Sequence, residues 1–367
     1  MRHSSSRSAA GLVLLRAART LLLGGALLGS LAACGSKTKT TDPDPVTPDT
    51  SANEPAIFAQ TGFSTQNGGT TGGAGGSTVT VRTLADLQQY ASSATPYVIK
   101  IEGTISGGTQ GASVNVNSNK TLLGVGSTAF LEGVGLTISG KRNVIVRNLK
   151  FTMSTVTNTY INDENRPQVA VNDGDCVTIS NSQNLWIDHC EFYNIDPVTQ
   201  TNQDLYDGLV DAKGSSQYIT VSWSYFHDHH KCHLIGSSDS DNLDRKMTFH
   251  HNYYSNIKER LPSYRGGTAH VFNNYFKHVT GSGVNSRVAA CLLVENNVFE
   301  DVRDPVTSKN SAVGYWSASG NQYLNCTGSQ PTNAACTLTV PYATTGVLSP
   351  AAEVKDAVTT KAGVGKL

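Results

Sequence analysis

The sequence predicts an all-β protein, a right-handed parallel β-helix with a short helix capping its N-terminal end. The first observation is repetition, because short β-prone runs place a few apolar residues before polar positions and a closing aromatic. The closing aromatics are Phe151, Phe192, Phe226, Tyr254, Phe276, Phe299 and Tyr323, and their last steps are 22, 23 and 24 residues. The second is composition, with 35 glycines in 367 residues and only 15% charged residues. Such spacing is typical of a solenoid, in which each coil completes its core by stacking on the next.

Other repeat folds fit less well. Helical arrays need long amphipathic helices and leucine-rich repeats need a Leu-x-x-Leu-x-Leu template, and the sequence shows neither. A β-sandwich is the remaining alternative, since strands at longer intervals can give a similar pattern. The repeats between residues 151 and 226 are longer, so their extra residues should leave as loops on one side and form a cleft.

Residues 1–33 are predicted to be an export signal. Arginines within the first 19 residues precede an apolar run at residues 21–28, which is shorter than the ~20 residues of a membrane-spanning helix. The segment Leu31-Ala-Ala-Cys34 resembles a bacterial lipobox, in which Cys34 would carry the lipid. An ordinary signal peptide with a chance cysteine is the alternative. Gly35 and Ser36 directly after Cys34 provide no Asp of the kind that retains a lipoprotein in the inner membrane, which favours an outer-membrane or cell-surface lipoprotein, with secretion as the other outcome.

Residues 34–56 are predicted to be a disordered tether, because Lys, Thr, Asp, Pro and Ser leave little apolar surface to bury. Residues 57–367 are predicted to form one folded domain. A helical window at residues 84–90 should cap the solenoid, and a buried strand should follow at residues 97–101. No comparable helix is expected after it, and the segment beyond Tyr323 is expected to pack back along the solenoid.

Four carboxylates fall in the longer repeats. Asp173 and Asp175 are separated by one glycine, which in an extended segment would put both side chains on one face. Asp207 and Asp211 lie one coil later. Stacked coils would bring these groups close together, where they repel unless a cation binds, and oxygen ligands favour Ca²⁺ over zinc or copper. A solvated acidic rim is the alternative, since Asp and Gly are ordinary turn residues.

Lys231, Arg260 and Arg265 form a candidate basic group. Arginine pairs bidentately with carboxylates, so these residues opposite an acidic metal site would suit an acidic polysaccharide. The alternative is that they are solvated surface charges. Lys plus Arg equals Asp plus Glu at 28 each, so the net charge gives no reason to expect nucleic acid as a partner.

The histidines do not predict a transition-metal site. His227, His229, His230 and His233 are dense, but such a strand-to-loop run has no fixed ligand geometry. His189 follows Asp188 without a nucleophile elbow, which favours a buried, hydrogen-bonded histidine.

The cysteines beyond Cys34 are even in number, which permits disulfides in an exported chain. Cys326 and Cys336 are the easiest pair to propose, and Cys176 and Cys190 come next. The sequence alone does not determine the pairing.

The chain carries several motifs in this order: Asp173-Gly-Asp175, Trp186-Ile-Asp-His189, Asp207 to Asp211 followed by Lys213-Gly214, Lys231 with Gly236-Ser-Ser-Asp239, and Arg260-Leu-Pro-Ser-Tyr-Arg265. It also carries Gly124-Val-Gly-Ser127 and Asn285-Ser-Arg287. Together these motifs resemble the bacterial and fungal pectate lyases of polysaccharide lyase family 1, from about Gly62 to Phe299.

The resemblance implies a parallel β-helix, Ca²⁺ and cleavage of polygalacturonate by β-elimination. It implies that Asp175, Asp207 and Asp211 are calcium ligands, with Asp173 as a fourth. Asp207 stands where some relatives carry Glu. The remaining matches imply Arg260 as the base that removes the C5 proton, with Lys231 and Arg265 as contacts to substrate carboxylates, in a protein expected to act as a monomer.

Three other functions were left open by the residues. Pectin lyases share the fold but typically lack the calcium carboxylates, so retaining all four favours unesterified polymer. A polygalacturonase needs a general acid and a second carboxylate for hydrolysis, and its motifs are missing. A noncatalytic surface adhesin would have no need of Lys231, Arg260 and Arg265 together.

Overall fold

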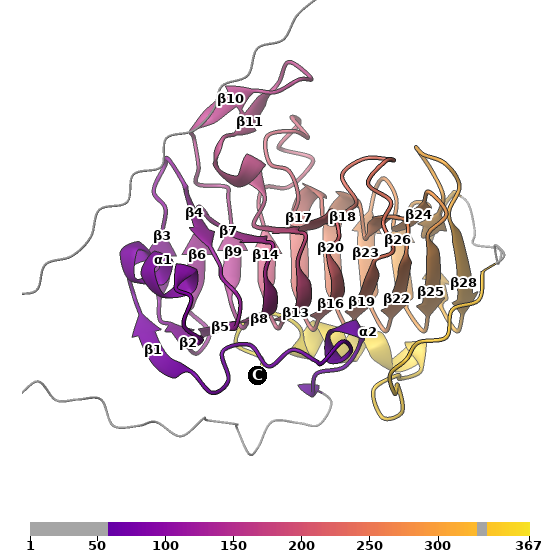
Figure 1. Cartoon of the computed structure of the whole chain (residues 1–367). Helices are drawn as coiled ribbons and strands as arrows, with labels where there is room; N and C mark the ends of the chain where they lie inside the picture. The colour runs from indigo at the N-terminus through magenta and orange to yellow at the C-terminus, as the bar shows by residue number, and fades with distance from the viewer. Residues whose placement is uncertain (1–57, 329–335) are drawn as a thin grey trace, which may run out of the picture. The chain divides into compact units, whose positions relative to one another are not determined.

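A computed structural model describes residues 58–328 and 336–367, and its strands stack into a parallel β-helix made of three long sheets (Figure 1). Each complete coil adds one strand to each sheet, and neighbouring strands pair in parallel, as Leu185 does with Ile219. The predicted fold class is confirmed. The predicted export signal at 1–33 and tether at 34–56 lie outside the described residues.

Within each of the three sheets, the strands follow one another in chain order. The ten-stranded sheet contains β1 (Ser77–Val81), β2 (Tyr97–Ile101), β5 (Lys120–Gly124), β8 (Arg142–Arg147), β13 (Gln183–Asp188), β16 (Gln217–Ser222), β19 (Lys246–His250), β22 (Thr268–Phe272), β25 (Cys291–Glu295) and β28 (Tyr315–Ser319). The nine-stranded sheet contains β3 (Thr104–Ser106), β6 (Phe130–Glu132), β9 (Lys150–Thr152), β14 (Glu191–Tyr193), β17 (Tyr225–Lys231), β20 (Tyr253–Glu259), β23 (Tyr275–Val279), β26 (Val298–Val302) and β29 (Gln322–Leu324). The eight-stranded sheet contains β4 (Ala112–Asn115), β7 (Val134–Ser139), β12 (Val177–Ser180), β15 (Val210–Lys213), β18 (Leu234–Ile235), β21 (Ser263–Arg265), β24 (Val284–Arg287) and β27 (Val306–Thr307).

The closing aromatics of the sequence repeats form one stack inside the solenoid. They lie on successive strands of the nine-stranded sheet, from Phe151 on β9 to Tyr323 on β29, with neighbouring ring centroids 4.6 to 5.3 Å apart. Because each ring packs on the rings of the adjacent coils, the spacing that predicts the fold also sets the register between coils.

Hydrogen-bonded asparagine side chains form a ladder at the corner that precedes the later strands of this sheet. Asn274 Oδ1 accepts a hydrogen bond from the backbone N–H of Asn252 and another from its side-chain amide, both at 3.0 Å. Asn297 does the same for Asn274 in the next coil. The ladder satisfies buried backbone and amide groups at each corner, which explains the asparagines in the repeats.

Helix α1 (Leu84–Ser92) covers the core at the N-terminal end of the solenoid, as predicted. Leu87 and Ala91 are fully buried. The side chain of Thr83 caps the helix by accepting a hydrogen bond from the backbone N–H of Asp86 at 3.2 Å, which satisfies one free donor of the first turn.

A second helix, α2 (Ala351–Lys361), shows that the expectation of no further helix was wrong. Ala351, Val354 and Val358 recur at helical spacing and are buried in a cluster outside the solenoid, with Trp223, Tyr275 and Val298. The C-terminal segment therefore packs back against the coils, as expected, and covers Tyr275 of β23. Within the described parts of the chain, no helix is long and apolar enough to cross a membrane.

The disulfide joins Cys291 and Cys336, which are 45 residues apart, so both pairs proposed from the sequence are wrong. Cys326, Cys176 and Cys190 are free thiols, and the last two are fully buried. Proximity in a solenoid depends on which coils a segment runs past, and the C-terminal segment runs past the start of β25, where Cys291 lies.

The extra residues of the long early coils form insertions that precede strands β12 and β15 of the eight-stranded sheet. A hairpin of β10 (Thr159–Ile161) and β11 (Pro167–Val169) and a 3₁₀ turn, η3 (Val171–Gly174), precede β12, while residues 194–209 form a loop before β15. Figure 1 shows the hairpin projecting beyond the stacked strands. The backbone N–H of Val169 donates to Leu205 O at 2.8 Å, so the two insertions support each other beside the acidic residues.

Candidate active site

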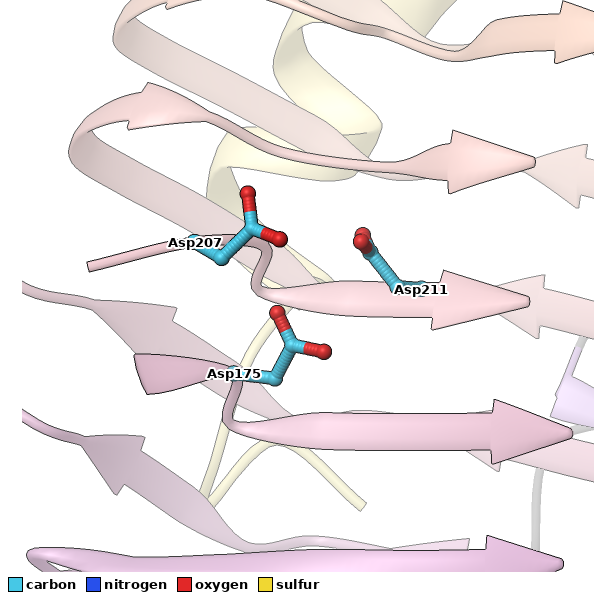
Figure 2. Close-up of side chains that lie close together, drawn as sticks. All are labelled: Asp175, Asp207 and Asp211. Atoms are coloured by element: carbon cyan, nitrogen blue, oxygen red, sulfur yellow. The ribbon is translucent and has the colours of Figure 1, made fainter. Parts of the chain in front are cut away.

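Three of the four predicted carboxylates meet where these insertions enter the sheet. Asp175 and Asp207 lie just before β12 and β15, and Asp211 lies on β15, opposite Thr178 of β12. Each residue offers an oxygen that lies within 4.8 Å of the others. Figure 2 shows the three side chains drawn together from two neighbouring coils. We call this set the Asp175–Asp207–Asp211 group.

Hydrogen bonds from other described residues hold the carboxylates of Asp175 and Asp211 in place, but they do not reach one oxygen of Asp211. The backbone N–H of Gly208 donates to Asp175 Oδ1 at 2.6 Å, and the Thr178 hydroxyl donates to Oδ2 at 2.7 Å. The backbone N–H of Leu234 donates to Asp211 Oδ1 at 2.8 Å, while the buried Oδ2 has no hydrogen-bond partner among the residues that the structure describes. An unsatisfied buried carboxylate oxygen is costly, so this oxygen is suited to a cation.

Glycine is required beside Asp211. A Cβ atom at Gly208 would lie 2.0 Å from Asp211 Oδ1 and 2.4 Å from its Cγ. The turn between Asp207 and Asp211 can therefore bring the two carboxylates this close only because residue 208 has no side chain.

The group is electrostatically unfavourable without a cation. Burial raises the pKa of the Asp175 carboxyl to about 6, and the Asp207 charge contributes in the same direction. Burial, together with the charges of Asp175 and Asp207, raises the pKa of Asp211 well above its usual value. Lys213 Nζ, 3.6 Å from Asp175 Oδ2, offsets part of this repulsion. The arrangement fits a hard divalent cation with oxygen ligands, of which Ca²⁺ is typical.

Asp173, the fourth predicted ligand, lies outside the Asp175–Asp207–Asp211 group. It is exposed, and its Oδ1 accepts a hydrogen bond from the Tyr160 hydroxyl of the hairpin at 3.3 Å. The assumption of an extended segment was wrong here, because Asn172 and Asp173 adopt φ of 51° and 52° within η3. Asn and Asp tolerate this left-handed conformation, which turns the two side chains away from simple alternation.

Two of the three predicted cations meet at Asp207. Its Oδ1 lies 3.1 Å from Lys231 Nζ and 3.4 Å from Arg260 Nη1. Lys231 ends β17 and pairs with Glu259 of β20, so Arg260 follows one position later in the next coil. Burial raises the pKa of Asp207, but the charges of Lys231 and Arg260 outweigh it, and the pKa is lowered overall. Asp207 is therefore ionised and links the acidic and basic residues.

Arg265, the third predicted cation, is placed with other partners. On β21 its Nε donates to Asp239 Oδ1 at 2.9 Å and its Nη1 to Gly236 O at 2.7 Å. Arg287 is its register partner on β24, and Arg287 Nη2 lies 3.9 Å from the same Asp239 oxygen. In the eight-stranded sheet, the coils that follow the acidic group therefore carry two paired arginines, Arg265 and Arg287.

Sequence reasoning assigned no role to Lys213, Asp204, Asp239 or Arg287, although each is paired within the site. Two of them carried a usable signal. Lys213 is two residues after Asp211, so a strand places both on one face. Arg287 follows Arg265 by 22 residues, the same step that separates Tyr254 from Phe276.

Two buried histidines hydrogen-bond to backbone carbonyls of the site, while His189 is buried and hydrogen-bonded elsewhere, as the sequence favoured. His229 Nε2 donates to the backbone carbonyl of Asp207 at 2.7 Å, and His233 Nδ1 donates to that of Val210 at 3.0 Å. Burial lowers the pKa of both imidazoles to about 3, so they are neutral at pH 7. His189 is fully buried, with Nδ1 2.6 Å from Asp188 Oδ2.

The fold and the site together define a class of protein. It is a parallel β-helix protein in which a buried carboxylate group lies beside cationic side chains suited to binding a polyanion. A family model for pectate lyases matches residues 48–367. A pectate trisaccharide-lyase from Bacillus licheniformis is 41% identical over 323 residues, which cover 86% of this chain and 89% of that protein. A probable pectate lyase B from Aspergillus flavus is 37% identical over 287 residues, covering 77% and 81% of the two chains.

Solved structures agree. A pectate lyase from Bacillus sp. N165 in complex with trigalacturonate is 33% identical, with a TM-score of 0.73 over 84% of this chain and 99% of that one. Pectate lyase C from Erwinia chrysanthemi, determined with Ca²⁺, is 27% identical, with a TM-score of 0.69 over 84% and 97%. The chain belongs to the pectate lyase family, as the sequence motifs indicated, and is a polysaccharide lyase.

Proposed function

We propose that this protein is a calcium-dependent pectate lyase that cleaves α-1,4-polygalacturonate by β-elimination and yields 4,5-unsaturated oligogalacturonides. The observation that carries the proposal is the shared oxygen of Asp207, which joins a buried carboxylate group to the cations Lys231 and Arg260. Relatives of this family bind trigalacturonate and pentagalacturonic acid, which supports the same class of substrate for this protein.

Asp175, Asp207 and Asp211 are the residues that would hold calcium, and the unpartnered Asp211 Oδ2 is the oxygen that most needs it. Asp173 is expected to contribute as a further, outer carboxylate, since its side chain is exposed beside the group. Bound Ca²⁺ would offset the carboxylate repulsion and withdraw charge from a substrate carboxylate, which stabilises the enolate-like state at C5.

The chain's own residues then bind the polymer and move its proton. Lys231 and Arg265 bind uronate carboxylates and fix the sugar next to Arg260. Arg260 removes the proton from C5, the C5–H electrons form the C4–C5 double bond, and the C4–O bond breaks. The leaving oxygen takes up a proton, so no water is added across the cleaved bond.

Arginine is an unusual base because its guanidinium is ordinarily protonated. Arg260 has φ of 69°, in the left-handed region that other non-glycine residues of this chain also adopt. Its Nη1 is held 3.4 Å from Asp207 Oδ1, beside the carboxylate group. Such a held orientation supports a role for Arg260 at the reacting carbon.

Mass spectrometry of the products tests this mechanism directly. Elimination leaves a chain pair whose summed mass equals that of the starting oligogalacturonide, whereas hydrolysis adds one water. Products whose summed mass includes the added water would overturn the proposal in favour of a hydrolase.

We also propose that the domain is exported and anchored by a lipid on Cys34, or otherwise secreted. The arginines, the apolar run at residues 21–28 and Leu31-Ala-Ala-Cys34 support this. Globomycin blocks lipoprotein signal cleavage, so the treated cells should accumulate precursor. Unchanged processing, or processing that persists in Cys34→Ala, would contradict the lipid anchor.

A further inference from the structure

Lys231 has a second carboxylate partner that does not belong to the Asp175–Asp207–Asp211 group. Its Nζ lies 3.2 Å from Asp204 Oδ1 and 3.1 Å from Asp207 Oδ1. The Lys231 side chain is 9% exposed and that of Asp204 is 14% exposed, so both ion pairs are largely shielded from water. The ammonium that is proposed to bind substrate is therefore already held between two protein carboxylates.

The other oxygen of Asp204 is held by the hairpin. Arg166, next to the turn between β10 and β11, lies with Nη1 2.5 Å from Asp204 Oδ2. Burial raises the pKa of the Asp204 carboxyl, but the Arg166 hydrogen bond and the Lys231 charge lower it overall, so Asp204 is ionised. Asp204 thus bridges a residue of the hairpin insertion and a residue of the proposed catalytic centre.

The two carboxylates that pair with Lys231 have different further partners. Asp207 belongs to the carboxylate group and is also paired with Arg260. Asp204 lies in the 194–209 loop, which is tied to the hairpin by the Asn202 amide donating to Pro167 O at 2.7 Å. If Asp204 leaves Lys231, its charge keeps the Arg166 partner, so its release is less costly than that of an unpaired buried charge.

We propose that Asp204 competes with a substrate carboxylate for the Lys231 ammonium, and that Arg166 weakens this competition by holding the opposite Asp204 oxygen. The inference rests on the proposed function, because it takes Lys231 as a substrate contact. A uronate carboxylate must displace Asp204 to reach Lys231, and Arg166 provides the displaced carboxylate with a partner. Asp204 is then an affinity-setting residue rather than a catalytic one.

The signs of two substitutions distinguish this from a purely structural ion pair. Asp204→Asn removes the competitor, so the KM for polygalacturonate should fall, by roughly fivefold for a pair of this exposure. Arg166→Gln leaves Asp204 with Lys231 alone, so KM should rise by a similar factor. Arg166→Gln in the Asp204→Asn background should have no further effect, because Arg166 is proposed to act only through Asp204. In all three variants kcat should change less than KM.

Asp163→Asn is the matched control, since Asp163 is an exposed carboxylate of the same hairpin. It should leave KM unchanged when all variants are measured at one calcium concentration and near-physiological salt. An equal fall in KM for Asp163→Asn would show a general charge effect and overturn the proposal. A rise in KM for Asp204→Asn, no change, or additive effects in the double variant would overturn it too.

Retention on immobilised polygalacturonate gives a second readout that needs no turnover. With calcium present, the salt needed for elution should increase for Asp204→Asn and decrease for Arg166→Gln relative to the wild-type protein. A wild-type protein that binds but does not cleave would refute the proposed activity while the elution order still tests Asp204. Active wild-type protein with an unchanged elution order would refute the role of Asp204 alone.

Discussion

Asp207 Oδ1 lies 3.4 Å from Arg260 Nη1, which places a carboxylate of the acidic group in contact with the arginine of the basic one. The two residues come from neighbouring parts of the stack, since Asp207 precedes β15 and Arg260 follows β20. A residue that is proposed to bind the cation is therefore in contact with the residue that is proposed to remove the proton. Substitutions on the two sides of this contact should therefore have separable effects.

Arg260→Lys should remove nearly all turnover and leave substrate binding measurable. Lysine keeps a positive charge near Asp207, but its ammonium lacks the guanidinium geometry aimed at C5. We expect kcat to fall by about 100-fold or more, the scale of a lost proton-transfer group, while retention on immobilised polygalacturonate persists. The measurement is the rate of unsaturated product formed, and a substantially active variant would contradict the assignment of Arg260 as the base.

Asp211→Asn should abolish calcium binding and stabilise the calcium-free protein. The variant removes one of three mutually repelling carboxylates, while its amide oxygen can still accept from the Leu234 N–H. In chelator its Tm should exceed that of the wild-type protein, and added calcium should no longer raise it. Thermal unfolding with and without calcium provides the test.

Asp173→Asn is the control for that experiment. Because Asp173 lies outside the group, this variant should retain most of the calcium-induced rise in Tm. A loss as complete as that of Asp211→Asn would show that Asp173 is an essential ligand when calcium is bound.

Asp188→Asn should destabilise the fold rather than alter the chemistry. The buried Asp188 carboxylate accepts from Arg147 Nε at 2.7 Å and from the Ser222 hydroxyl at 2.6 Å, and it contacts His189. Removing the charge deprives Arg147 of an anionic partner, and we expect roughly 3 kcal/mol less free energy of unfolding at pH 7. Chemical denaturation measures this difference.

The pH dependence of that difference has a definite sign. Burial raises the Asp188 pKa, but His189, Arg147 and Ser222 outweigh it, so the folded-state pKa is lowered. A depressed carboxyl pKa stabilises the fold above the unfolded value of about 4. The stabilisation is lost as pH falls through the lower folded value. The gap between wild-type and Asp188→Asn protein should therefore shrink toward about pH 3, and a gap that widened there would be inconsistent with this pairing.

Phe226→Ala should cost more stability than Tyr323→Ala. Phe226 is fully buried and stacks between Phe192 at 5.0 Å and Tyr254 at 5.1 Å, whereas Tyr323 is partly exposed and, in the described stack, has an aromatic neighbour on one side, Phe299 at 5.3 Å. We expect a loss of about 4 kcal/mol at Phe226 and clearly less at Tyr323. Equal losses would mean that the stack does not set the register between coils.

The sequence predicted what depends on local periodicity. The aromatic spacing predicted the coils and their stack, and the longer coils predicted insertions beside the carboxylates. Asp175, Asp207 and Asp211 could be grouped because stacked coils superpose equivalent positions. Lys231 and Arg260 were proposed from their charge and received their roles from the family motifs, and their contact with one Asp207 oxygen needed the register of β17 and β20.

What the sequence could not predict depends on long-range packing or on single backbone angles. Asn172 and Asp173 adopt a left-handed conformation, and Asp173 lies outside the group. Asn and Asp tolerate this conformation without requiring it, so their presence does not fix the turn. The disulfide of Cys291 depends on the path of the C-terminal segment. Helix α2 has few strongly apolar residues, so its burial on Trp223 gave little signal in advance.

The most direct test follows ultraviolet absorbance while the soluble domain, starting near residue 57, acts on polygalacturonate. The 4,5-unsaturated product absorbs, whereas a hydrolytic product does not. A calcium-dependent eliminase should give absorbance that rises with calcium, stops rising when excess chelator is added and resumes when calcium is restored. No rise with calcium, or a rise that chelator leaves unchanged, would contradict the proposed activity.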